Sequence, residues 1–74
     1  MHNQHLIRMG NQIATFFDSM PERDEAMLDL ASHLRKFWEP RMRKSLLSQF
    51  DAGDTASLHP LLTSTLQQHR AEIE

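Results

Sequence analysis

The sequence predicts an all-α fold, a small bundle of three to four short helices in a single domain that spans residues 1–74. Apolar residues recur every three to four positions, and no segment alternates apolar and polar residues as a half-buried strand does. Valine and tyrosine, two residues that strands favour, are absent. Prolines and one Asp/Gly-rich turn separate four helical patterns, which we place at about 3–19, 22–38, 40–50 and 59–71.

The first helical pattern, residues 3–19, has an apolar face that covers half of the helical wheel. A surface helix typically needs an apolar stripe only about 100° wide. We therefore expect one side of this helix to pack inside the domain and a flank to meet another surface. Gly10 lies within the helix, where glycine costs about 1 kcal/mol relative to alanine. Either another backbone approaches Gly10 closely, or the chain tolerates a weak position there. The apolar face comprises Leu6, Ile7, Met9, Gly10, Ile13, Ala14, Phe16 and Phe17.

The second pattern, residues 22–38, begins beside Pro21, because proline disfavours helical geometry in the preceding residue and suits a first helical turn. Acidic residues in its first turns, and Arg35 and Lys36 in its last turn, complement the helix dipole. Its apolar stripe comprises Ala26, Met27, Leu30, Ala31, Leu34, Phe37 and Trp38. We expect Phe37 to lie in the core with most of this stripe.

The third and fourth patterns are short helices joined by a turn. Pro40 suits the first turn of the third helix, and Gly53 can adopt a positive φ in the turn after it. The fourth helix begins either with His59 at the N-cap and Pro60 at N1, or with Ser57 as the cap. We expect its polar end, residues 67–74, to fray.

Composition excludes several kinds of chemistry. The 74 residues include no cysteine, which removes disulfides, Fe–S ligation and thiolate zinc sites, and two glycines leave no room for a Gly-rich phosphate loop. The five histidines show no metal-binding spacing, so we expect no metal site. We likewise expect no cofactor and no catalytic residue in this chain. No apolar run approaches the roughly 20 residues of a membrane span, and residues 1–5 do not resemble a signal peptide. We expect a cytoplasmic protein without membrane contact.

One dense feature is the segment 35–44, which holds five basic residues and one acid around Phe37, Trp38 and Pro40. The aromatic residues could be core residues with solvated charges around them. Trp and Arg are also enriched at interface hot spots, which favours a protein interface. Basic residues beside a stacking aromatic can bind nucleic acid, but the net charge of −2 weighs against that interpretation.

Two stretches of the sequence resemble a known family. Residues 6–14 read Leu-Ile-Arg-Met-Gly-Asn-Gln-Ile-Ala and are followed by Phe16-Phe17, and residues 31–43 read Ala-Ser-His-Leu-Arg-Lys-Phe-Trp-Glu-Pro-Arg-Met-Arg. Together with Leu-His-Pro-Leu at 58–61, they resemble the delta subunit of cytoplasmic NAD-dependent formate dehydrogenases that contain molybdenum or tungsten. The central segment is the most specific part. Gly10 departs from the alanine usual in the family.

The resemblance implies a non-catalytic accessory subunit of an oxidoreductase complex. In such enzymes the large catalytic subunit carries the bis-molybdopterin guanine dinucleotide centre and Fe–S clusters, and other subunits carry FMN and pass electrons to NAD. The delta subunit is expected to bind the large subunit and to support cofactor insertion or complex stability. The lack of cysteines and of a nucleotide-binding loop agrees with this expectation.

Contacts with the partner are expected at eight residues of the two stretches: Arg8, Asn11, Gln12, Arg35, Trp38, Pro40, Arg41 and Arg43. Asn11 and Gln12 could equally well be polar because they face solvent, or because they form a hydrogen bond from the helix to a turn. The alternative function is that of a small free-standing helical module, which either binds nucleic acid or has a regulatory role. In the nucleic-acid case, residues 40–50 would be the recognition helix.

Overall fold

The computed structural model describes residues 4–74, which form five helices and no strand. This confirms the predicted all-α class. The helices are α1 (Gln4–Phe17), α2 (Arg23–Phe37), α3 (Pro40–Asp51), α4 (Pro60–Gln68) and α5 (Arg70–Ile73). Their ends differ from the predicted ends by one or two residues, apart from the split of the last helix. The predicted start at residue 3 lies outside the described residues.

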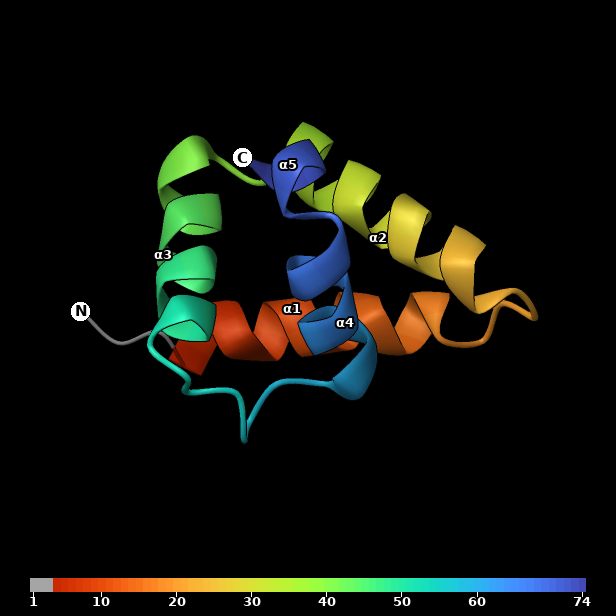
Figure 1. The fold of residues 1–74 in the computed structure, drawn as a ribbon, viewed down its shortest axis with the longest axis horizontal. Coiled ribbons are helices and arrows are strands. Elements are labelled where there is room, and N and C mark those ends of the chain that lie inside the picture. Colours follow the sequence, from red (N-terminus) through yellow and green to blue (C-terminus); the bar gives the residue numbers. More distant parts are fainter. Residues whose placement is uncertain (1–3) are drawn as a thin grey trace.

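The helices surround α4 rather than lying side by side as a regular bundle (Figure 1). In that view α1 lies along one edge of the molecule, α3 rises from one end of it, and α2 runs diagonally from the other end. Helix α4 packs against α1, α2 and α3, and α5 packs against α2. The inward face of α4 is completely buried and consists of Leu61, Leu62, Thr65 and Leu66.

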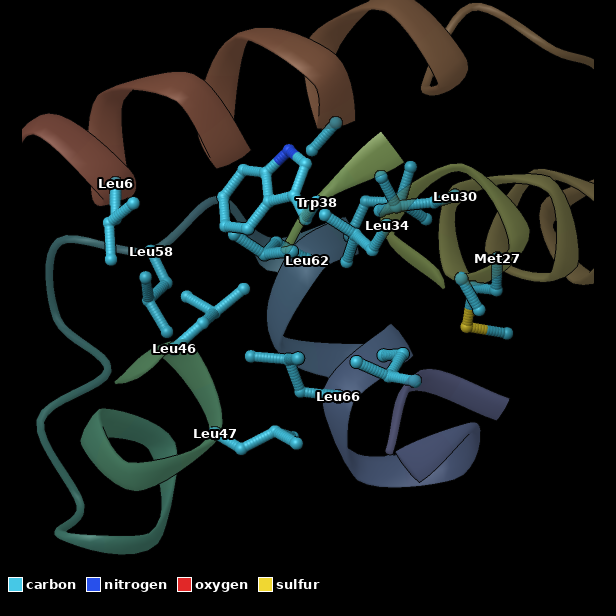
Figure 2. Close-up of a cluster of buried hydrophobic side chains, with 14 of the residues drawn as sticks. Leu6, Met27, Leu30, Leu34, Trp38, Leu46, Leu47, Leu58, Leu62 and Leu66 are labelled. Carbon is cyan, nitrogen blue, oxygen red and sulfur yellow. The ribbon is translucent and has the colours of Figure 1, made fainter. Parts of the chain in front are cut away.

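The core is centred on the ring of Trp38, which is only 4% exposed (Figure 2). Trp38 follows the last residue of α2 and has an extended backbone, with φ −94° and ψ 137°. It therefore leaves the helical path, and its side chain packs into the core. Phe37, which we expected in the core, lies at the edge of the buried stripe of α2 and is 72% exposed. That expectation was wrong: Trp38, and not Phe37, takes the place in the core at the end of α2.

Gly10 gives the Trp38 ring its place against α1. A Cβ atom at Gly10 would lie 3.0 Å from Cδ2 of Leu62 and 3.6 Å from Cη2 of Trp38. The partners that approach closely are therefore side chains of α4 and of the corner between α2 and α3, and not another backbone. The glycine lets two large apolar side chains reach the surface of α1, which offsets its weaker helix propensity.

Arg43 of α3 closes the corner between α2 and α3. Its Nη1 atom donates hydrogen bonds of 2.8 Å to the carbonyl oxygens of Arg35 and Trp38. The last carbonyls of a helix lack partners within the helix, and a charged donor satisfies them well. Arg43 therefore holds the backbone of Trp38 in the position that directs its ring inward.

Asn11 of α1 ties down the loop that leads into α4. Its Nδ2 atom donates to the carbonyl oxygen of Ser57 at 2.9 Å, and its Oδ1 atom accepts from the amide of His59 at 2.8 Å. His59 in turn is the N-cap of α4, because its Nδ1 atom accepts from the amide of Leu61 at 3.0 Å. This decides between the two predicted caps in favour of His59. Gly53 adopts φ +82° earlier in the same loop, as predicted.

The C-terminal segment is ordered into a helix, contrary to the expected fraying. The predicted helix 59–71 breaks at His69, whose backbone has φ −123° and ψ 32°, and α5 follows. Ile73 is fully buried, and Arg70 pairs with both oxygens of Asp51 at 2.7 and 2.8 Å and with Glu74 at 2.7 Å. The burial of Ile73 and the ion pairs of Arg70 hold this turn in place, and the average polarity of the tail does not reveal them.

Replacing Asn11 with Ala is expected to lower the free energy of unfolding by about 1–3 kcal/mol, because the Ser57 carbonyl and the His59 amide both lose their partner. The measurement is chemical denaturation followed by the fluorescence of the single tryptophan. Gln12→Ala is the matched control, since Gln12 is exposed on the same helix. Equal unfolding midpoints for the two variants would contradict a role of Asn11 in fixing the loop.

The stability of the fold is expected to fall in acid through Asp51. Hydrogen bonds from Arg70 hold the pKa of this carboxyl below its ordinary value of 3.8. The unfolded chain therefore takes up the proton at a higher pH than the folded chain does. The contribution of Asp51 is complete above pH 3.8 and is lost as the pH falls through the lower pKa of the folded state. In a plot of the denaturant midpoint of unfolding against pH, the midpoint should fall less steeply in acid for Asp51→Asn than for the natural chain. An unchanged slope would refute this role of Asp51.

Candidate interaction surface

A row of aromatic rings lies on the outside of α1 and α2. The rings of Phe16 and Phe17 meet edge to face with centroids 5.2 Å apart, and Phe17 meets His33 at 5.9 Å. His33 lies against Phe37 with centroids 4.8 Å apart. We call these four residues, with the adjacent Ile13, the aromatic surface. It joins two helices that are separated in sequence by the Met20-Pro21 turn.

The aromatic surface is uncovered at both of its ends. Phe16 and Phe37 are each 72% exposed, whereas Phe17 and His33 are half-buried between them. Adjacent residues of a helix point about 100° apart. In the pair Phe16-Phe17, therefore, the two rings cannot point in the same direction, and Phe17 takes the inner place. In the pair Phe37-Trp38 the helix ends at Phe37, and the extended backbone of Trp38 turns its ring into the core.

A small depression opens in the aromatic surface between α1 and α2. Its volume is about 260 Å³, and its lining consists of Gln12, Ile13, Phe16, Phe17 and His33. None of these side chains is an acid, lysine or arginine. The depression therefore favours an uncharged, apolar group, because a charge placed there would lose hydration without gaining a counter-charge.

A wider polar groove lies next to the aromatic surface, between α1 and the loop before α4. Its volume is about 720 Å³, and it is lined by Gln4, Ile7, Arg8, Asn11, Gln12, Thr15, Asp54 and Ser57. It brings together Arg8, Asn11 and Gln12, three of the residues expected to contact a partner. Gln12 lines both the groove and the apolar depression, so the two surfaces are continuous. The side-chain amide of Asn11 is hydrogen-bonded to the loop before α4. This is the hydrogen bond from the helix to a turn that the sequence offered as an alternative to partner contact.

The residues of the basic segment 35–44 have different surroundings in the structure. The ring of Trp38 is in the core and offers almost no surface to a partner, which revises its expected role as a contact. Arg43 is engaged with carbonyl groups inside the chain, and Nη1 of Arg35 donates to the carbonyl of Glu72 in α5 at 3.4 Å. Arg41 and Pro40 are exposed on α3. These surroundings differ because the residues belong to two helices and to the corner between them.

A further depression of about 510 Å³ lies between α3 and the C-terminal segment, and its lining combines apolar surface with several charged side chains. Its lining includes Pro40, Arg43, Lys44, Asp51 and Arg70. Carboxylates of Asp51 and Glu74 already pair with Arg70, and this pairing raises the pKa of the guanidinium. The charges of this region thus serve mainly to hold α5 against α3.

Residues 16, 33 and 37 are the part of the candidate surface that the sequence interpretation missed. Phe16 and Phe37 both belong to the predicted apolar faces. The pattern that could have indicated the exposure of Phe16 is the adjacent pair Phe16-Phe17 within one helix, since neighbouring helical side chains point about 100° apart. Their mutual contact depends on how α1 crosses α2, which no local pattern specifies.

Two further kinds of feature are absent from residues 4–74. This part of the chain contains no group of three or more His, Cys, Asp or Glu side chains placed to hold a metal ion. None of its helices is both long enough and apolar enough to cross a bilayer.

These features define a small helical protein whose distinctive outward feature is an uncovered aromatic surface beside a polar groove. A comparison with family models matches residues 5–66 to the NADH-dependent formate dehydrogenase delta subunit, FdsD. The chain belongs to this family, which confirms the resemblance seen in its sequence. The match includes the whole aromatic surface and ends within α4. Comparisons with curated proteins and with solved structures give no significant match.

Because Trp38 is buried and Phe37 is exposed, substitutions of these two neighbouring residues should differ greatly in their effect on stability. Trp38→Ala should cost about 3–5 kcal/mol of unfolding free energy, because it empties the centre of the core. Phe37→Ser should stay within about 0.5 kcal/mol of the natural chain, because most of its ring is in water. Denaturation followed by circular dichroism measures both values, and a large loss for Phe37→Ser would contradict its exposed position.

Proposed function

We propose that this delta subunit binds the large catalytic subunit of an NAD-dependent formate dehydrogenase in the cytoplasm and supports complex stability or insertion of the molybdenum or tungsten cofactor. Membership of the FdsD family makes the chain an accessory component of such an enzyme. In this proposal the bis-molybdopterin guanine dinucleotide, the Fe–S clusters and FMN belong to the other subunits. The chain itself acts through contact rather than through chemistry.

The observation that carries this proposal is the exposure of Phe16 and Phe37. The core is filled without them: Leu30, Leu34 and Leu62 show no exposed area. Full burial of a phenylalanine side chain contributes up to about 1.5–3 kcal/mol, so a partner that covers both rings gains a substantial part of its binding energy there. Gln12 lines the depression beside the rings, and Arg8 lies in the adjoining groove; polar side chains at the edge of an apolar surface are typical of protein interfaces.

The nucleic-acid alternative has weaker support. A recognition helix at residues 40–50 would need several free basic side chains on one face of α3. Arg43 instead donates to the carbonyl groups of Arg35 and Trp38. Arg41 and Lys44 remain exposed, which is a small basic contribution for a chain with a net charge of −2.

Co-purification tests the proposal. A tagged chain with Phe16→Ser and Phe37→Ser should retain at least about tenfold less large subunit than the natural chain does, because it loses two central apolar contacts. Leu28→Ser is the matched control, since Leu28 is 48% exposed on α2 but does not belong to the aromatic surface.

Two further measurements complete this test. Formate-dependent NAD reduction and the metal content of the large subunit should fall together with retention of the doubly substituted chain. Circular dichroism establishes that this chain is folded. Full retention of the large subunit by the folded double variant would refute the role of Phe16 and Phe37, and failure of the natural chain to retain the large subunit would refute the proposed function itself.

A further inference from the structure

Building on the proposed function, we infer that the corner between α2 and α3 binds an acidic surface of the large catalytic subunit. Three observations support this inference: the cations of the corner have no carboxylate partner, those on α3 lie where the helix dipole disfavours positive charge, and the rest of the chain is acidic. We call this part of the molecule the basic corner, and it consists of Arg35, Lys36, Arg41, Arg43 and Lys44.

The five cations of the basic corner are not neutralised within residues 4–74. Arg35 and Arg43 donate hydrogen bonds to backbone carbonyl groups, which carry no formal charge and therefore leave both guanidinium charges uncompensated. The other three cations of the corner are exposed. The ion pairs of this part of the chain involve a different set of basic residues: Arg23, His59, His69 and Arg70.

The start of α3 is an unfavourable place for positive charge. The N-terminal end of a helix carries a partial positive charge, which favours acidic residues there and disfavours basic ones. The first turn of α3 contains no acid, and it holds Arg41 and Arg43 with Lys44 directly after it. Arg43 is accounted for by its hydrogen bonds to the end of α2. The stability of α3 does not account for Arg41 and Lys44, and an anionic surface placed against them would relieve the repulsion within the corner.

The basic corner differs in charge from the rest of the chain. Its five cations and one acid, Glu39, give a net charge of +4, whereas the other three cations and nine acids give −6. Five of those acids lie between residues 18 and 29, in the turn before α2 and in its first half, away from the corner (Figure 1). An anionic partner is therefore attracted to one end of α2 and repelled from the other, which orients the chain during encounter.

The mixed charge of the corner favours a protein as the anionic partner. Glu39 is exposed at the N-cap of α3, in the middle of the basic corner. A phosphate backbone or an anionic membrane presents negative charge throughout, so it would be repelled by Glu39 and by the acidic remainder of the chain. A protein surface can place carboxylates opposite the cations and none opposite Glu39.

A second copy of this chain is a weaker candidate for the acidic surface. Its acids near the start of α2 have an explanation within the chain, because Asp24 and Glu25 complement the positive end of that helix dipole. Asp18 likewise lies 4.0 Å from Arg23. The exposed cations of the basic corner have no corresponding explanation, so a partner outside the chain is needed for them alone.

Zero-length crosslinking in the assembled complex tests the inference. A carbodiimide joins a lysine amine to a carboxylate only where the two groups are in contact, and the only lysines of the sequence are Lys36 and Lys44. Mass spectrometry of the treated complex should identify links from Lys36 or Lys44 to aspartate or glutamate residues of the large subunit. The control chain, with Lys36→Arg and Lys44→Arg, keeps both charges. It should retain the large subunit and lose these links.

Charge reversal gives a second measurement, the rate at which the chain associates with large subunit purified without it. At about 0.02 M salt, Arg41→Glu should slow association at least about fivefold, because it removes electrostatic attraction at the corner. Arg23→Glu changes the net charge equally at the other end of α2 and should slow association less than about twofold. The difference should shrink at about 0.5 M salt, which screens charges on surfaces. An acid suits the first turn of either helix, so both variants should fold.

The outcomes separate this inference from the proposed function. If neither lysine is linked to the large subunit in an intact complex, or if Arg41→Glu and Arg23→Glu slow association equally, the basic corner is not the contact, although the proposed function stands. Links to a second copy of this chain would overturn the inference as well. So would binding of duplex DNA or of phosphatidylserine vesicles that Arg41→Glu abolishes. If the natural chain does not retain the large subunit at all, the proposed function fails, and the inference fails with it.

Discussion

The burial of Trp38 against Gly10 is the contact on which the rest of the structure depends. The indole ring lies within 3.6 Å of the position that a side chain at Gly10 would occupy, and Leu62 of α4 comes closer still. One ring thus joins α1 to α4 and to the corner between α2 and α3. Arg43 keeps the corner closed by satisfying its carbonyl groups. In a small core, a single side chain that contacts several helices has a large share in fixing how they pack.

The same contact determines what the molecule shows to its surroundings. Once Trp38 turns inward, Phe37 remains on the flank of α2, where it reaches His33 and continues the row that begins at Phe16. The aromatic surface is therefore a consequence of how the core is filled, and it lies beside the polar groove that holds Arg8 and Gln12.

Hydrogen bonds and ion pairs between residues far apart in the sequence fix the loop before α4 and the C-terminal segment. Asn11 reaches across 48 residues to the amide of His59, which places the cap of α4. Arg70 connects the end of α3 with α5 through Asp51, and Ile73 fills the remaining space beside α2. These links explain why the polar C-terminal segment is helical and docked although its composition resembles that of a frayed end.

Local patterns in the chain were sufficient for the all-α class, for the approximate bounds of α1, α2 and α3, for the His59 cap as one of two choices, and for the family. They succeed because helical periodicity, proline positions and capping residues act within a few residues of the backbone. The assignment of Phe37 to the core and the single long last helix were wrong. Those features depend on where α2 stops being helical and on how α1, α2 and α4 cross, and only packing among residues far apart in sequence decides them.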